Sequence, residues 1–261
     1  MAFTVHAVMP GVWHIVDCMG VCMTLLEGEN AAMLVDTGYG IEDVADFMRH
    51  MTDLPLTVFL THNHHDHAMG ARCFPETYML EADMADWRMF TNDKMRRRVL
   101  TQAIGKNLTV DEKTFLAGEI PLPKVMKPGV IDLGGLTAEI IEAPGHTPGS
   151  AVVYVPERKL LLSGDDWNPC TWLFFPQALG LREYRSNMRG IQQLPFEKVL
   201  CPHREALYDR WMFDDFFNAL TDGNLRAAEP VNIAPYEQID TCQATLPHDQ
   251  VFVFDWAKSG L

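Results

Sequence analysis

Thr61–His67, with the sequence THNHHDH, concentrates metal-binding side chains in one short stretch of this 261-residue chain. His62 and His64 are two residues apart, so in extended backbone both imidazoles can point to the same side. Asp66 and His67 fall on the next turn of chain and can face a second ion. A lone histidine is usually a surface or core residue, but four potential ligands within six residues predict a metal centre. Imidazole and carboxylate together suit zinc, with iron or manganese possible where oxygen ligands predominate.

Potential ligands also follow strand-like runs elsewhere in the chain. The run before the histidine stretch is Val58–Leu60, and the others are Met33–Val35 before Asp36, Ile140–Ile141 before His146, Leu161–Leu162 before Asp165, and Val199–Leu200 before His203. Residues at the strand ends of a layered sheet converge on one edge, where the scaffold holds them rigidly. We therefore expect these side chains to share one site.

The remaining pattern predicts a layered α/β protein. Strands are expected at 11–16, 22–27, 31–35, 57–60, 137–141, 151–155, 160–162 and 198–200, and helices at 41–51, within 82–116, at 182–193 and at 207–220. The tail from Glu229 is expected to be irregular until the apolar run Val251–Phe254. No internal repeat or low-complexity linker divides the sequence, which predicts one domain.

With these motifs, the sequence resembles the metallo-β-lactamase superfamily, whose first motif, HxHxDH, matches His62–His67. The resemblance also covers Val35–Gly38, Ala143–Ser150, Ser163–Asp165 and Cys201–His203, so it spans roughly residues 12–203. It implies an α/β fold, a four-layer αββα sandwich with mixed sheets and a helical insertion. A single domain would cover residues 1–261, with the insertion at about 82–116 and a C-terminal helix and tail at about 207–261.

The resemblance also implies which residues hold the two ions. One ion would be held by His62, His64 and His146, the other by Asp66, His67 and His203, with Asp165 bridging them. Asp36 looks like the acid of the family that orients ligands by hydrogen bonding and need not touch metal.

The sequence departs from the family pattern at two points. Pro202, instead of the usual glycine, precedes His203, and this removes a backbone donor and fixes the local φ. Asp166 directly follows Asp165, so the bridge could shift by one residue; Asp165 is preferred because it aligns with the family's glycine–aspartate pattern. His65 is expected to point away from the pocket.

Two divalent ions can share a water, lower its pKa toward ~7 and leave a bridging hydroxide as the nucleophile. Asp66 could orient that hydroxide and pass its proton to the leaving group. The phenol of Tyr39 could donate to the oxyanion, with Tyr184 as a second candidate. The aromatic stretch Trp167–Phe175, together with Trp87–Phe90, could either line the pocket and select an apolar group or pack the core.

Composition excludes several classes of protein. The formal net charge is -14 and the pI near 5.0, which argues against binding to a phosphate backbone. The basic run Arg96–Arg98 is expected to be a solvated helix face. Met1–His6 does not resemble a secretory signal, and no apolar run reaches the ~18 residues of a membrane span. We expect a cytoplasmic protein without a nucleic-acid or membrane partner, whose six cysteines are reduced.

The sequence thus predicts a metal-dependent hydrolase that acts on a small molecule, and a lactone or an ester is preferred. Thioesters and phosphodiesters remain alternatives, because the resemblance extends to enzymes that cleave them. A single-iron sulfur dioxygenase with the same fold is a further alternative, since that branch keeps similar histidines. A binding protein without catalysis is disfavoured because none of the expected ligands is missing.

Overall fold

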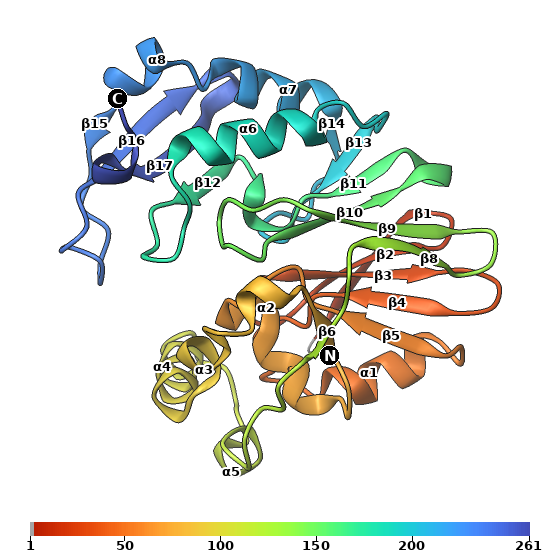
Figure 1. Cartoon of the computed structure of the whole chain (residues 1–261). Coiled ribbons are helices and arrows are strands. Elements are labelled where there is room, and N and C mark those ends of the chain that lie inside the picture. The colour runs from red at the N-terminus through yellow and green to blue at the C-terminus, as the bar shows by residue number, and fades with distance from the viewer. Residues whose placement is uncertain (1–2) are drawn as a thin grey trace.

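A computed structural model of the chain describes residues 3–261 and contains two sheets packed face to face between layers of helices (Figure 1). Met1 and Ala2 lie outside the described residues. They belong to two predictions, the one on the segment Met1–His6 and the one of a single domain over residues 1–261. The first sheet has seven strands in chain order: β1 (Thr4–Met9), β2 (Val12–Val16), β3 (Cys22–Glu27), β4 (Ala32–Val35), β5 (Leu56–Phe59), β6 (Tyr78–Met79) and β7 (Lys124–Val125).

The second sheet has six strands, in the order β14-β13-β11-β10-β9-β8. They are β8 (Gly129–Asp132), β9 (Thr137–Glu142), β10 (Ala151–Val155), β11 (Leu160–Leu162), β13 (Lys198–Leu200) and β14 (Tyr208–Asp209). The strands β4 and β5 pair in parallel in the first sheet, as do β11 and β13 in the second, while most other pairs are antiparallel. Both sheets are therefore mixed, as the sequence predicts.

A third sheet of four strands, order β12-β17-β16-β15, corrects the expectation of an irregular tail. Its strands are β12 (Cys170–Leu173), β15 (Glu229–Pro230), β16 (Thr241–Leu246) and β17 (Gln250–Asp255). We call it the C-terminal sheet. The strand β12 lies in the aromatic stretch, and it pairs in parallel with β17, about eighty positions further along the chain, from Cys170↔Val251 to Leu173↔Phe254. The strands β1 and β8 were likewise not expected.

Helices cover the outer faces of the sandwich. On the first sheet lie α1 (Val44–Met51) and α2 (His65–Ala68), on the second α6 (Leu181–Ile191) and α7 (Arg210–Ala219), followed by α8 (Asp222–Arg226). The predicted insertion holds α3 (Trp87–Thr91), α4 (Asp93–Gly105) and α5 (Glu112–Phe115), which gather at one end of the first sheet in Figure 1. This arrangement is the predicted αββα sandwich with a helical insertion.

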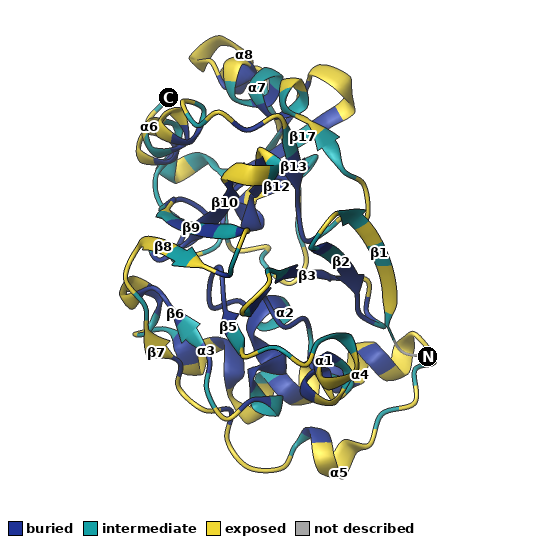
Figure 2. Ribbon diagram, turned by 90° about the vertical axis from the view of Figure 1, so that its right-hand side faces the viewer, coloured by how far each residue is buried: buried dark blue, intermediate teal, exposed yellow. Residues whose placement is uncertain are grey.

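The strand β4 shows why these residues form a central strand. Met33 and Val35 point into the layer between the two sheets, whereas Ala32 and Leu34 point to the other face, under α1. Side chains alternate between the faces of a strand, and a strand covered on both faces is apolar throughout. Buried residues accordingly fill the middle of the molecule in Figure 2, while exposed residues lie on the outer helices and loops.

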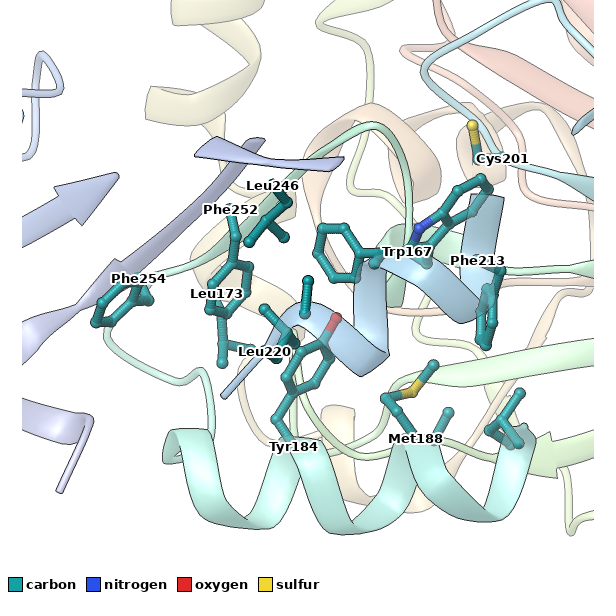
Figure 3. Close-up of a cluster of buried hydrophobic side chains, with 14 of the residues drawn as sticks. Trp167, Leu173, Tyr184, Met188, Cys201, Phe213, Leu220, Leu246, Phe252 and Phe254 are labelled. Atoms are coloured by element: carbon teal, nitrogen blue, oxygen red, sulfur yellow. The ribbon is translucent and has the colours of Figure 1, made fainter. Parts of the chain in front are cut away.

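Part of the aromatic stretch packs the core above the second sheet (Figure 3). Trp167 and Phe174 are fully buried, and the Trp167 ring lies 5.6 Å from that of Phe213. Tyr184 is also buried there, and its hydroxyl donates to the backbone carbonyl of Asp166. Tyr184 is therefore a packing residue and not the second candidate for an oxyanion donor, because its hydroxyl already has a partner in the core.

The basic run Arg96–Arg98 and the six cysteines were also the subject of predictions. Arg97 and Arg98 are exposed, but Arg96 is buried and donates to the backbone carbonyls of Phe115, Ala117 and Gly118, so the run is only partly a solvated face. All six cysteines are free, as predicted. Within residues 3–261, every helix is too short or too polar to cross a membrane.

Candidate metal centre

The expected ligands meet at the ends of strands from both sheets. His62 and His64 follow β5, His146 follows β9, Asp165 follows β11 and His203 follows β13. In the second sheet, β9, β11 and β13 run in the same direction, because β10 is antiparallel to both β9 and β11 and β13 is parallel to β11. The strand ends therefore lie at one edge, as the sequence predicts.

A first group consists of His62, His64, His146 and Asp165, all buried. One nitrogen or oxygen from each can be chosen so that all of these atoms lie within 4.8 Å of one another. The backbone explains why both histidines of the first motif take part: His64 is still extended, with φ -62 and ψ 148, and only the next residue begins α2. Alternate residues of extended chain share a side.

A second group consists of Asp66, His67 and His203, again with one ligand atom each within 4.8 Å. Asp66 and His67 lie in the single turn of α2, and the ring of His67 lies 4.2 Å from that of His62, so the two groups adjoin. In the second group, His67 is fully buried, whereas the side chains of Asp66 and His203 are 16% and 27% exposed. The second group is therefore the one that solvent reaches more easily.

The carboxylate of Asp165 lies between the two groups. Its Oδ2 is 3.4 Å from His146 Nε2 and 3.9 Å from His62 Nε2. Its Oδ1 is 3.0 Å from His203 Nε2 and 3.4 Å from His67 Nε2. Oδ2 also accepts a hydrogen bond from His203 Nε2 at 3.1 Å, so it faces both groups while Oδ1 faces the second. This one carboxylate can therefore serve both groups.

Buried atoms without hydrogen-bond partners test whether these residues fit metal ions. Among the described residues, His62 Nε2, His67 Nε2 and Asp165 Oδ1 are buried without a hydrogen bond; His203 Nε2 is close to both oxygens of Asp165, but its hydrogen bond goes to Oδ2. An unsatisfied buried polar atom costs about 1–3 kcal/mol, and three of them gathered in one place are hard to account for as packing. Cations held by the two groups would give all three atoms a partner, so the donor set fits the expected ions.

Hydrogen bonds to the outer ring nitrogens orient the imidazoles. His67 Nδ1 donates to Asp36 Oδ2 at 3.0 Å, and His146 Nδ1 donates to the Trp172 carbonyl at 2.7 Å. The Thr61 hydroxyl donates to Asp36 and accepts from His62 Nδ1 at 3.1 Å. Each of these bonds places the proton on Nδ1 and leaves the Nε2 lone pair for a metal.

Asp36 has the orienting role that the resemblance implies. It has a left-handed backbone conformation, with φ 65, directly after β4, and an aspartate tolerates this conformation better than most residues. Its Oδ1 also accepts from the Thr61 backbone N–H at 2.7 Å. It therefore fixes both His67 and the start of the histidine stretch.

Replacing Asp36 by asparagine is expected to weaken metal binding by about 10–100-fold, the usual effect of losing a carboxylate behind a ligand histidine. The ring of His67 would lose its charged acceptor while the side-chain shape stays the same. Titration of the metal-free protein in competition with a chromophoric chelator measures the affinity. Asp53→Asn, an exposed loop residue, is the matched control, and equal affinities for the two variants would refute the orienting role.

Burial sets the protonation state of the first group. It lowers the pKa of His62, His64 and His146 below the ordinary value, and the neighbouring imidazoles add to the effect. These rings are therefore neutral at pH 7, which is the form that binds metal.

The carboxylates have the opposite effect in the second group. Burial lowers the pKa of His67, but the carboxylates of Asp165, Asp66 and Asp36 outweigh it and raise that pKa well above the ordinary value. Burial raises the pKa of Asp66, but the imidazoles of His67, His65 and His203 lower it to about 2 on balance. Without a metal, this group thus combines an anionic carboxylate with a cationic ring, and a bound cation would take the place of that ring's proton.

Both departures from the family pattern are accommodated. Asp165 joins the first group, whereas Asp166 is turned the other way and accepts from the backbone N–H of His146 at 3.0 Å. The carbonyl of Pro202 accepts from the Cys22 backbone N–H at 2.7 Å, so the segment before His203 is held in place despite the missing donor.

His65 and Tyr39 lie beside the second group. His65 belongs to neither group, and its ring meets that of Tyr39 edge-on at 5.6 Å. Burial, then the carboxylates of Asp66, Asp17 and Asp165, raise the pKa of Tyr39, so its phenol stays neutral.

The aromatic residues divide between core and site. Phe175 lies against the first group, with its ring 4.8 Å from that of His64 and 5.3 Å from that of His146. Phe90 of α3 approaches the ring of His64 from another direction, at 4.5 Å. Both expected segments therefore contribute one ring to the site and bury others, such as Trp87 and Trp167, in the core.

Gln177 was missed at the sequence level. Its side-chain amide lies 2.6 Å from His64 Nε2. A glutamine in a loop gives no signal of such a role, because the contact depends on how the loop folds back over the first group.

Similarity of the sequence to known proteins identifies the class of protein. The model of the metallo-beta-lactamase superfamily matches residues 16–203, well over half of the chain. The chain therefore belongs to the metallo-beta-lactamase superfamily. An acyl-coenzyme A thioesterase, MBLAC2, from Gallus gallus is 26% identical over 202 residues, which cover 69% of this chain and 70% of that protein. A linear primary-alkylsulfatase from a Pseudomonas strain is 23% identical over 173 residues, which cover 54% of this chain but only 32% of the sulfatase.

Solved structures agree on the fold. A metallo-beta-lactamase from Pontibacter korlensis has a TM-score of 0.61 at 17% identity, covering 84% of this chain and 99% of that one. A metallo-beta-lactamase family protein from Thermus thermophilus has a TM-score of 0.58 at 18% identity, covering 85% of this chain and 82% of that one. The superfamily and its named relatives support a metal-dependent hydrolase in general.

Proposed function

We propose that this protein is a dinuclear metal-dependent hydrolase that cleaves a small lactone or carboxylic ester. The observation that supports it most directly is the convergence of three partnerless buried atoms, His62 Nε2, His67 Nε2 and Asp165 Oδ1, between two groups of potential ligands. The carboxylate of Asp165, which lies within 3.4 Å of a ring nitrogen of each group, favours two ions over one.

In this proposal His62, His64 and His146 would hold the first ion, Asp66, His67 and His203 would hold the second, and Asp165 would serve both. Bound divalent ions supply an activated water as nucleophile and polarise the carbonyl of the substrate. The imidazole-rich donor set favours zinc. Iron and manganese are the alternatives, and a solved structure with the same fold, at a TM-score of 0.53 and 20% identity, is that of TTHA1623 in a di-iron-bound form.

Two side chains on the more exposed side of the centre would act on the reactants. The carboxylate of Asp66 stays ionised and is 16% exposed, so it can orient the attacking water and pass on its proton. The neutral phenol of Tyr39 can donate a hydrogen bond to the oxygen on which negative charge develops.

Tyr39→Phe is expected to lower kcat on the order of 10²-fold while leaving metal content unchanged, because it removes one donor to the developing oxyanion. Steady-state kinetics on a hydrolysed ester, with metal analysis of the same sample, measures both quantities. An unchanged kcat would remove Tyr39 from the catalytic group and leave it as a packing residue.

Thioester hydrolysis is the second candidate, because the thioesterase relative matches 69% of this chain. Attack on the carbonyl is common to esters and thioesters, so the same centre suits both and the leaving group decides between them. The small-molecule substrate, the cytoplasmic location and the lack of nucleic-acid and membrane partners belong to the proposal. The formal charge of -14 supports the exclusion of nucleic acid.

The test combines metal analysis with substrates that share one acyl group. Purified protein is expected to hold two ions per chain and to hydrolyse lactones or esters, with loss of activity in chelator and recovery on adding zinc. Turnover of only the matched thioester would select the second candidate. Turnover limited to sulfate esters, β-lactams or phosphodiesters would contradict both. One iron per chain, with oxygen consumed on adding a persulfide, would establish the dioxygenase alternative.

A further inference from the structure

The loop after β12, residues 174–178, lies against the first group. Besides the contacts of Phe175 with His64 and His146, the amide of Gln177 lies 2.6 Å from His64 Nε2. The backbone N–H of Leu179 donates to the Gly145 carbonyl at 2.9 Å, which ties the end of the loop to the segment that carries His146. This loop, called here the 174–178 loop, therefore covers one side of the candidate centre.

Gln177 gives the outer ring nitrogen of His64 a hydrogen-bond partner, as other candidate ligand histidines also have. Thr61, Asp36 and the Trp172 carbonyl each contact the outer nitrogen of a candidate ligand histidine. His64 differs because its Nδ1 faces the group, 2.9 Å from His146 Nε2, and its Nε2 faces outward to Gln177. The atom of Gln177 that faces this ring is the amide nitrogen, Nε2, so without a metal the amide donates and His64 Nε2 accepts. A metal on Nδ1 would place the ring proton on Nε2, and the amide would then turn over to present its oxygen to that proton.

Lys258 holds the 174–178 loop from outside. It follows β17 at the end of the short 3-10 turn Trp256–Lys258. Its Nζ donates to three backbone carbonyls of the loop, those of Phe175 at 3.1 Å, Pro176 at 2.6 Å and Ala178 at 2.9 Å. An ammonium has three N–H donors, so all three are used on one loop. Hydrogen bonds from a charged donor are roughly twice as strong as neutral ones.

The topology explains how a residue near position 260 reaches the site. Parallel pairing of β12 with β17 sets the end of β17 beside the end of β12, where the 174–178 loop begins. The residues that match the superfamily model end at 203, so β17 and Lys258 lie outside the matched part. The C-terminal sheet thus reaches the candidate centre directly through the Trp172 carbonyl of β12 and, beyond β12, through the 174–178 loop.

We propose that Lys258 is a positioning residue that holds the 174–178 loop in place, so that Gln177 orients His64 and Phe175 forms an apolar wall beside it. The inference rests on the proposed metal-dependent hydrolase function and adds to it. The C-terminal sheet thereby strengthens binding of the first ion and favours substrates with an apolar acyl group.

Lys258→Met, made in the whole 261-residue chain, tests the proposal. Methionine keeps most of the side-chain length and removes every donor. Hydrogen exchange of the backbone amides in residues 174–179 is expected to become faster. Zinc affinity at one of the two sites is expected to fall by about 10–100-fold, the range seen when a partner of a ligand histidine is lost. For a series of esters of increasing acyl length, KM is expected to rise more for the long chains than for the short ones.

Lys127→Met is the matched control, since Lys127 is an exposed residue between β7 and β8, outside the C-terminal sheet. Gln177→Leu is the second variant and covers the case in which Lys258→Met does not fold. It is expected to weaken one zinc site to a similar extent without faster exchange in the loop. Wild-type zinc affinity in Gln177→Leu, or wild-type exchange in a folded Lys258→Met, would overturn the proposal.

Exchange and zinc titration need no substrate, so they separate this inference from the proposed function. If the wild-type protein binds two zinc ions but hydrolyses no ester or lactone, the proposed function fails and the two measurements still decide the role of Lys258. If it binds no metal, both fail together.

Discussion

Asp165→Asn is expected to lower turnover on the order of 10³-fold and to reduce metal content from two ions per chain toward one or none. The carboxylate contacts both groups, with Oδ2 at 3.4 Å from His146 Nε2 and Oδ1 at 3.0 Å from His203 Nε2. An amide keeps the shape but supplies one oxygen and no charge. Stabilisation of transition-state charge by a metal amounts to several kcal/mol, and each ~1.4 kcal/mol is a factor of ten in rate.

Elemental analysis and kinetics on the same preparation check this prediction. Asp53→Asn makes the same chemical change at an exposed loop position and is expected to behave as wild type. Circular dichroism and thermal unfolding with chelator present show whether the metal-free fold is kept. A folded Asp165→Asn protein that still binds two ions and turns over at the wild-type rate would contradict the bridging role.

The site could be predicted from the sequence because its residues are close in sequence or adjoin strands. Two ligands of each group come from one short segment, His62 and His64 in extended backbone and Asp66 and His67 in the turn of α2. The remaining ligands follow apolar runs that are easy to identify as strands. Convergence of strand ends at one edge then needs only the general topology of a layered sheet.

The surroundings of the site were harder to predict, because they depend on contacts between distant segments. Gln177 meets His64 across more than one hundred positions, and Lys258 reaches the 174–178 loop through the pairing of β12 with β17. The strand β16 was missed because its sequence, TCQATL, is too polar to indicate a buried strand. Its inward residues become buried only against α6 and α7.

Arg96 and the aromatic stretch show a second reason why the roles of single residues could not be predicted from the sequence. Arg96 is part of a basic run, yet it is buried against the carbonyls after α5 while its neighbours are exposed. In the aromatic stretch, Trp167 and Phe174 pack the core and Phe175 approaches the first group. Composition could not assign these roles, because adjacent residues of one type point in different directions.

Asp66→Ala is expected to abolish measurable hydrolysis while the fold is retained. The Oδ2 of Asp66 lies 3.7 Å from His67 Nε2 and 3.8 Å from His203 Nε2, which is too far for a hydrogen bond. Alanine favours the helical turn in which the residue lies. The substitution therefore removes a potential ligand and proton carrier with little cost to packing, and leaves two candidate ligands besides Asp165 for the second ion.

The Asp66→Ala variant distinguishes a centre that needs two ions for hydrolysis from one that needs a single ion. If two ions are needed, Asp66→Ala should keep about one ion per chain, held by the first group, and lose activity on the order of 10³-fold or more. Asp66→Asn, which keeps the side-chain shape, should behave similarly, whereas Asp53→Ala should be fully active. Wild-type turnover in Asp66→Ala with one ion per chain would show that the first group suffices for hydrolysis, because this variant leaves all four of its side chains intact.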